Sequence, residues 1–194
     1  MKNTIIASVL FLAAGSVMAA EGAPSAGATT PGSLSFSWTG TVPTTPQSTG
    51  DWEFQDALGE PFAPASATLL LVKDKGAIKI NSERDISFFI TSKSGSNLNR
   101  VSAYLAQNPQ SIGFTLSRQF SLSSNVNPQN GEVAIIVNNK PLNVGSAQAV
   151  ELDGVSGSPQ VPVNIALAAS AAENNVTEGA VVGFNANVVF SVAL

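Results

Sequence analysis

The chain has 194 residues, of which 44% are hydrophobic and only 11% are charged, and its net charge is −4. It contains neither cysteine nor histidine, which excludes disulfides and thiolate or imidazole metal sites and removes the commonest general base. The mild acidic balance, with no block of basic residues, argues against nucleic acid as a partner. We therefore expect one domain without a cofactor or a metal, stabilised by its core and its sheets.

Residues 1–19 have the features of a secretory signal peptide. Lys2 makes the start positive, an apolar run covers residues 5–14, and Ala19 closes a stretch of small residues that suits a signal peptidase. The apolar run is about half of the roughly 20 residues that a membrane-spanning helix needs. We predict export, cleavage after Ala19 and a flexible lead-in over residues 20–32, because no large apolar side chain occurs in that lead-in.

Residues 33–42 alternate between apolar and polar side chains, which predicts a β-strand with one apolar face. Its apolar positions are Leu34, Phe36, Trp38, Gly40 and Val42. A glycine at an apolar strand position often marks a close approach of another backbone or side chain. A strand on a flexible segment is suited to completing the sheet of another molecule. The alternative, a first strand that covers its own closed sandwich, stays open on these residues alone.

Short β-type segments fill the middle of the chain. Runs of apolar and β-branched residues between turn residues predict strands at 52–54, 68–73, 77–81, 86–91, 112–122, 132–137, 140–144, 147–152 and 160–169. Asn138 and Asn139 predict a two-residue hairpin turn, because asparagine tolerates positive φ angles. Residues 97–107 predict a short helix, with Val101, Tyr104 and Leu105 at helical spacing. So many short strands with almost no helix indicate an all-β sandwich.

A polar loop over residues 170–178 leads into a second alternating segment at the end of the sequence. Its apolar positions are Phe184, Ala186, Val188, Phe190, Val192 and Leu194. This pattern predicts a last strand with one apolar face. Two strand-like ends in one secreted domain suggest a link in a polymer.

The basic residues gather in the first half of the domain. Six of them are candidates for a receptor patch that binds acidic glycans, namely Lys73, Lys75, Lys79, Arg84, Lys93 and Arg100. The alternative interpretation is an exposed sheet edge that lysine keeps soluble. Trp52 and Phe54 likewise have two interpretations, as a stacking surface for sugars or as core residues under a loop.

The two ends of the chain together resemble the chaperone-usher pilins. Residues 32–42 look like the donor-strand extension of that family, and residues 178–194 look like its closing strand. The cysteine-free chain is similar to major subunits of colonisation-factor fimbriae of the coli surface antigen type. The resemblance implies an incomplete immunoglobulin-like β-sandwich over residues 43–194, completed by a donor strand from a neighbouring subunit. The apolar residues of 33–42 would enter a neighbour, and those of 184–194 would line one wall of its groove.

The same resemblance implies a function and a set of partners. The expected function is that of a structural subunit of a fimbria at the cell surface, reached through the periplasm, and not that of an enzyme. The partners would be copies of the chain itself, a periplasmic chaperone, an outer-membrane usher, a tip adhesin and host-cell glycans. The alternatives are an adhesin domain that itself binds a host glycan or glycoprotein, and an autonomous secreted sandwich or enzyme. Ala193 departs from the tyrosine usual at this position in the family.

Overall fold

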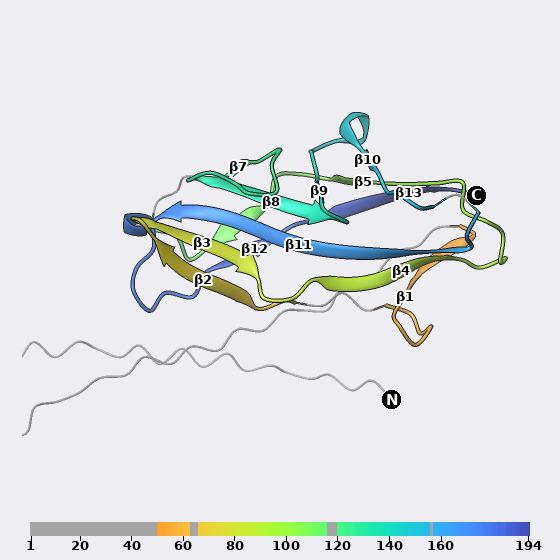
Figure 1. Ribbon diagram of the computed structural model, residues 1–194, viewed down its shortest axis with the longest axis horizontal. Coiled ribbons are helices and arrows are strands. Elements are labelled where there is room, and N and C mark those ends of the chain that lie inside the picture. Colours follow the sequence, from red (N-terminus) through yellow and green to blue (C-terminus); the bar gives the residue numbers. More distant parts are fainter. Residues whose placement is uncertain (1–49, 63–65, 116–119, 156) are drawn as a thin grey trace, which may run out of the picture. The chain divides into compact units, whose positions relative to one another are not determined.

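The computed structural model describes residues 50–62, 66–115, 120–155 and 157–194 (Figure 1). The signal peptide, lead-in and donor strand that the sequence predicts lie outside these residues. Within the described part of the chain, no helix is long and apolar enough to cross a membrane.

The regular structure of the described residues is almost entirely β. Two 3₁₀ turns, η1 (Ser146–Gln148) and η2 (Glu173–Asn175), interrupt the series of strands. The strands are β1 (Trp52–Gln55), β2 (Leu69–Asp74), β3 (Ala77–Ser82), β4 (Ile86–Ser92), β5 (Arg100–Leu105), β6 (Gln110–Ile112), β7 (Ser121–Leu122), β8 (Glu132–Val137), β9 (Lys140–Pro141), β10 (Val150–Glu151), β11 (Gln160–Ala172), β12 (Gly183–Asn185) and β13 (Val188–Ala193).

The first sheet is built around the long strand β11. On one side, β11 pairs antiparallel with β4 through residues 160–165 and with β3 through residues 168–172. On its other side it pairs with β8, which in turn pairs with β7 and β9. β1 and β2 lie outside β4 and β3. β3 and β4 are therefore two parts of one long strand that is interrupted at residues 83–85.

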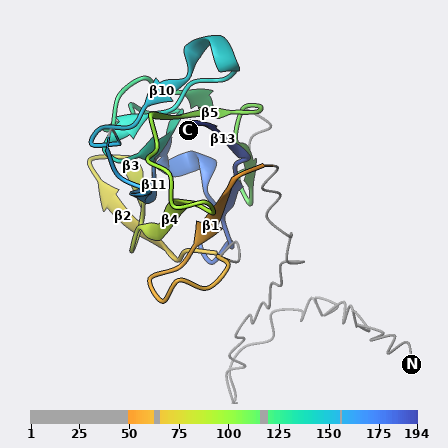
Figure 2. The ribbon, with the colours of Figure 1, turned by 90° about the vertical axis from the view of Figure 1, so that its right-hand side faces the viewer.

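The second sheet has the strand order β10, β5, β13. β6 follows β5 along the chain and pairs with β12, which precedes β13. The two pairings are thus successive parts of one antiparallel ribbon. They are separated because four residues, 106–109, stand opposite only two, 186–187. Viewed from the end, β5 and β13 lie on one side of the domain and β2 and β4 on the other (Figure 2).

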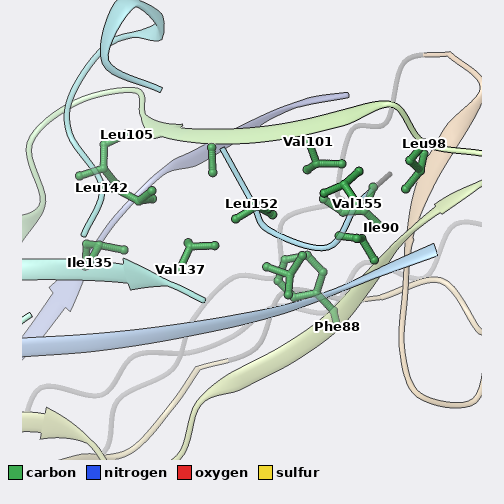
Figure 3. Packing of buried hydrophobic residues seen from close by; sticks show 13 residues of the cluster. Phe88, Ile90, Leu98, Val101, Leu105, Ile135, Val137, Leu142, Leu152 and Val155 are labelled. Atoms are coloured by element: carbon green, nitrogen blue, oxygen red, sulfur yellow. The ribbon is translucent and has the colours of Figure 1, made fainter. Parts of the chain in front are cut away.

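The main core fills the space between the two sheets (Figure 3). β4, β8 and β11 contribute alternate residues from one side, and β5 contributes residues from the other. Its buried members are Phe88, Ile90, Leu98, Val101, Ala103, Leu105, Ile135, Val137, Leu142, Leu152, Val155, Val161 and Val163. A smaller cluster around Ile80, Phe120 and Val133 forms a second core. The architecture is an all-β, immunoglobulin-like sandwich, as the sequence predicts.

Several local predictions are confirmed. The strands near 52–54, 68–73, 77–81, 86–91, 132–137 and 160–169 are all present. Asn138 and Asn139 have φ angles of 46° and 65°, and β8 and β9 pair across them. The predicted hairpin turn is therefore correct.

The helix predicted at residues 97–107 is wrong, because β5 occupies this segment. β5 pairs with β13 on one side and with β10 on the other. Val101, Ala103 and Leu105 alternate along β5 and are completely buried. The period of two in these apolar residues thus outweighs the helical spacing of Val101, Tyr104 and Leu105.

Three predicted strands are too long, and one of them is 140–144, because β9 covers only Lys140 and Pro141. The segment 112–122 forms no single strand, because β6 ends at Ile112 and β7 covers only Ser121 and Leu122. Of the segment 147–152, only Val150 and Glu151 are a strand, since a 3₁₀ turn occupies residues 146–148.

Gly113, just after β6, is a position where we expect alanine to be poorly tolerated. Its φ angle is +82°, and an added Cβ would overlap the backbone carbonyl oxygen of Val181. Gly113→Ala should lower the free energy of unfolding by more than about 2 kcal/mol. The clash adds to the roughly 1–2 kcal/mol cost of a left-handed conformation in a residue with a Cβ.

Gly95→Ala is the matched control for this prediction. Gly95 has a similar φ angle of +74°, but a Cβ added there would have no atom within 4 Å beyond its immediate neighbours in the chain. Urea denaturation of the two variants should therefore show a clearly smaller loss for Gly95→Ala. Equal losses would mean that the contact with Val181 has no part in the effect.

Candidate functional site

β13 is one of the two edge strands of the second sheet within the described residues. It pairs with β5 on one side, and no described residue pairs with its other edge. The same is true of β12, which pairs only with β6. An unpaired edge presents main-chain N–H and C=O groups that can pair with a strand from another chain. Residues 183–193 thus form the candidate site, which we call the β12–β13 edge.

The burial of side chains changes abruptly from β5 to β13. Val101, Ala103 and Leu105 of β5 have no exposed surface. Their direct cross-strand partners on β13 are Val192, Phe190 and Val188, respectively, and these are only half-buried. Because direct partners in an antiparallel pair share one face of the sheet, all six side chains point toward the core. The apolar face of β13 therefore lacks the cover that β5 has.

Aromatic residues flank this half-buried row. The ring of Phe190 contacts Phe54 of β1 and Phe88 of β4, each at a centroid distance of 5.7 Å. Phe62 stacks on Phe88 at 4.7 Å, and Trp52 meets Phe54 edge-on at 5.1 Å. The two sheets thus come together at the side where β13 and β1 are their outer strands. Trp52 and Phe54 pack against the main core, which favours their interpretation as core residues over that as a sugar-stacking surface.

The predicted row of residues 184–194 is divided by the structure into three parts. Val188, Phe190 and Val192 lie in one row on β13, and Ala186, just before β13, packs against the same core. Phe184 belongs to the second cluster, where its ring contacts Phe114 at 5.4 Å and Phe120 at 5.0 Å. Leu194 follows β13 and is exposed.

The aromatic residues around the edge carry no signal in the sequence that marks them as site residues. Phe62 and Phe88 are far from the C-terminal segment in the chain, and the pattern around Phe54 offers only a sugar platform or a core position. Alternation places Phe88 in a strand but gives no information on which strand lies opposite. The predicted donor residues Leu34, Phe36, Trp38, Gly40 and Val42 lie outside the described residues.

The six predicted patch residues lie in several parts of the sandwich. Lys73, Lys75 and Lys79 belong to the β2–β3 hairpin, whereas Arg84 lies at the interruption between β3 and β4, Lys93 follows β4, and Arg100 begins β5 in the other sheet. Lys73 forms an ion pair with Glu173 at 2.8 Å, and the hydrogen bond and charge of Glu173 raise the pKa of the Lys73 ammonium. The structure thus brings three of the six residues onto one hairpin.

A shallow depression lies at the interruption between β3 and β4. It is lined by Phe62, Ser66, Ala67, Thr68, Glu83, Arg84, Asp85, Ile86 and Ser87. None of these residues belongs to β12 or β13. Within the described ranges, no group of three or more carboxylate side chains is arranged to hold a metal ion.

Comparison with known proteins places this chain in a family. No family model matches the sequence. Over 207 aligned residues it is 36% identical to the CS5 fimbrial subunit of Escherichia coli, and the match covers 98% of each chain. Identity at this level over nearly the whole length goes with a shared fold. The chain therefore belongs to the family of fimbrial subunits, the structural proteins from which surface fimbriae are built.

Proposed function

We propose that this fimbrial subunit polymerises by strand exchange, in which the β12–β13 edge accepts residues 33–42 of a neighbouring copy. The proposal rests on the difference in side-chain burial between the paired strands β5 and β13. Val101, Ala103 and Leu105 are fully buried, while their partners on β13 are half-exposed. An added strand would cover the partners and pair with the open backbone edge in one step.

The incoming segment and the edge carry apolar residues at the same spacing. Residues 34–42 have five alternate apolar positions, and residues 184–192 have five as well. At roughly 3.3 Å per residue, residues 34–42 would span about 26 Å as an extended strand, whereas the accepting edge consists of two strands, β12 and β13, separated at residues 186–187. Four large apolar side chains, buried at roughly 1.5–3 kcal/mol each, would contribute about 6–12 kcal/mol before entropic costs. A contact of this strength dissociates slowly, which suits a fibre under mechanical load.

The proposal extends to the partners that such assembly needs. An uncovered apolar edge promotes aggregation, so a periplasmic chaperone would occupy it until an outer-membrane usher exchanges the chaperone for the next subunit. The finished fimbria would carry a tip adhesin and support adhesion to host-cell glycans. The role proposed for this chain is structural and not enzymatic, in keeping with its family and with a sequence that contains neither histidine nor cysteine.

Moving the proposed donor strand to the other end of the chain tests the mechanism. The variant starts at residue 43 and carries residues 32–42 behind Leu194 on a flexible glycine-serine linker, so that each molecule can fill its own edge. We expect this variant to be a stable monomer in sedimentation velocity and thermal unfolding. The mature chain without the relocation should polymerise or aggregate under the same conditions.

A second relocated variant serves as the control. It carries aspartate at the positions of Phe36 and Trp38 in the moved strand, which keeps the length and removes the apolar row. We expect this control to unfold at a lower temperature than the first relocated variant. If the unmodified mature chain is a monomer as stable as the relocated variant, strand exchange is not its mode of assembly.

A further inference from the structure

Residues 54–62 form a hairpin at the outer side of the first sheet, which we call the β1 hairpin (Figure 1). β1 supplies its first arm, and the chain returns beside that arm. The N–H of Phe62 donates a hydrogen bond to the carbonyl oxygen of Phe54 at 2.9 Å, and the N–H of Asp56 donates to that of Glu60 at 2.8 Å. The loop between Asp56 and Glu60 therefore has only three residues.

The carboxylate of Asp56 holds this loop. Its Oδ1 atom accepts hydrogen bonds from the N–H of Leu58 at 2.8 Å and from the N–H of Glu60 at 3.0 Å. The carbonyl oxygen of Asp56 accepts a third bond, from the N–H of Gly59 at 3.2 Å, and Gly59 has a φ angle of +83°. A turn with a left-handed glycine in third place is a common way to close a three-residue hairpin loop. One carboxylate oxygen thus ties the loop to the start of the return arm.

Apolar packing does not fix the loop. Residues 57–60 are all exposed, and Leu58 at the tip is 86% exposed. The path of the return arm consequently depends on main-chain hydrogen bonds and on the two bonds to the side chain of Asp56.

The return arm brings Phe62 to the aromatic residues beside β13. The ring of Phe62 is half-buried and stacks on that of Phe88 at 4.7 Å, with 26° between the ring planes. Phe88 in turn packs against Phe190 of β13 at 5.7 Å. Because Phe62 is the residue at which the return arm bonds to Phe54, a shift of this arm also shifts the ring of Phe62 relative to Phe88.

We propose that Asp56 is a positioning residue for the strand-accepting edge. Its carboxylate fixes the β1 hairpin, and the hairpin holds Phe62 where it supports Phe88 and Phe190 against an incoming strand. Without the carboxylate, the return arm is free to shift, the stack of Phe62 on Phe88 loosens, and Phe190 presents a less fixed surface. The expected consequence is faster release of the strand while the sandwich stays folded. This inference rests on the proposed strand exchange.

Binding of a synthetic peptide of residues 32–42 tests this role. The parent protein is the full mature chain with Phe36→Asp, whose own donor strand is defective, so that its edge stays open to the peptide. In this background Asp56→Ala should raise the dissociation constant about fivefold or more, mainly through faster release. Asp56→Asn should stay within about twofold of the parent, because the amide oxygen of asparagine can accept the same two hydrogen bonds.

Glu60→Ala is the matched control. It removes an exposed carboxylate from the same hairpin but keeps the main-chain N–H and C=O groups that bond Asp56. Its peptide binding should equal that of the parent. Thermal unfolding of each variant without peptide shows whether the domain is folded before binding is compared.

A double-mutant cycle with Phe62→Ala separates positioning from a general effect on stability. If Asp56 acts through Phe62, Asp56→Ala should change binding by less than about twofold once Phe62→Ala is present, whereas independent effects multiply. Effects that multiply, or binding by Asp56→Ala equal to that of the parent, overturn this role and leave strand exchange standing. A parent chain that does not bind the peptide overturns strand exchange itself, and the role of Asp56 with it.

Discussion

Phe36→Asp is expected to abolish fibres while leaving the acceptor domain folded. Phe36 is a large apolar residue within the proposed donor row, which would cover Val188, Phe190 and Val192 of the neighbour. The substitution removes roughly 1.5–3 kcal/mol of apolar burial. It also requires a carboxylate to be buried or protonated among apolar side chains, which adds several kcal/mol. The measurement is the number of fibres in electron micrographs, together with the ladder of polymers on gels of unboiled samples.

Ser35→Asp and Ser37→Asp are the controls for this prediction. Both residues fall at the polar positions of the predicted donor strand, so we expect their carboxylates to face solvent and fibres to form. Phe36→Asp should still bind a synthetic peptide of residues 32–42 and gain thermal stability from it, which separates a defective donor from a misfolded domain. Normal fibres from Phe36→Asp would show that this row does not enter a neighbour.

The strands of this domain are predictable from the sequence where a segment both alternates and is bounded by turns. The β8–β9 hairpin is an example, because Asn138 and Asn139 fix a local geometry that depends on no distant residue. The segment 86–91 is another, since Phe88 and Ile90 alternate with less buried residues. In both cases the local sequence pattern is sufficient to predict the structure of the segment.

Features that depend on the partner of a strand are not predictable in this way. The apolar row 184–194 is interrupted because the opposite strands, β5 and β6, are joined by the longer connection 106–109. The sequence of the row itself gives no information on the length of that connection. The helix predicted in place of β5 is wrong for the same reason, since the burial of β5 between β10 and β13 is set by tertiary pairing. The meeting of Phe54 and Phe190 likewise follows from how the sheets close and not from either local sequence.

Phe88→Ala is expected to have the largest effect on stability among single changes within the described domain. The side chain is only 4% exposed, and its ring contacts Phe54 at 5.5 Å, Phe62 at 4.7 Å and Phe190 at 5.7 Å. Truncation of a buried phenylalanine typically lowers the free energy of unfolding by about 3–5 kcal/mol, because apolar burial is lost and a cavity is left in the core. The free energy of unfolding of a domain is only about 5–15 kcal/mol in total, so this substitution would remove much of it.

Phe89→Ala tests whether the loss comes from this aromatic cluster. Phe89 is the next residue of the same strand and its side chain points to the opposite face of the sheet, where it is half-buried. Urea denaturation of the relocated-strand variant should give a loss for Phe88→Ala that exceeds that for Phe89→Ala by about 2 kcal/mol or more. Because the ring of Phe88 packs against that of Phe190, Phe88→Ala should also weaken binding of the 32–42 peptide, whereas Phe89→Ala should not. Equal effects on peptide binding would mean that the cluster stabilises the sandwich but does not shape the edge that accepts the strand.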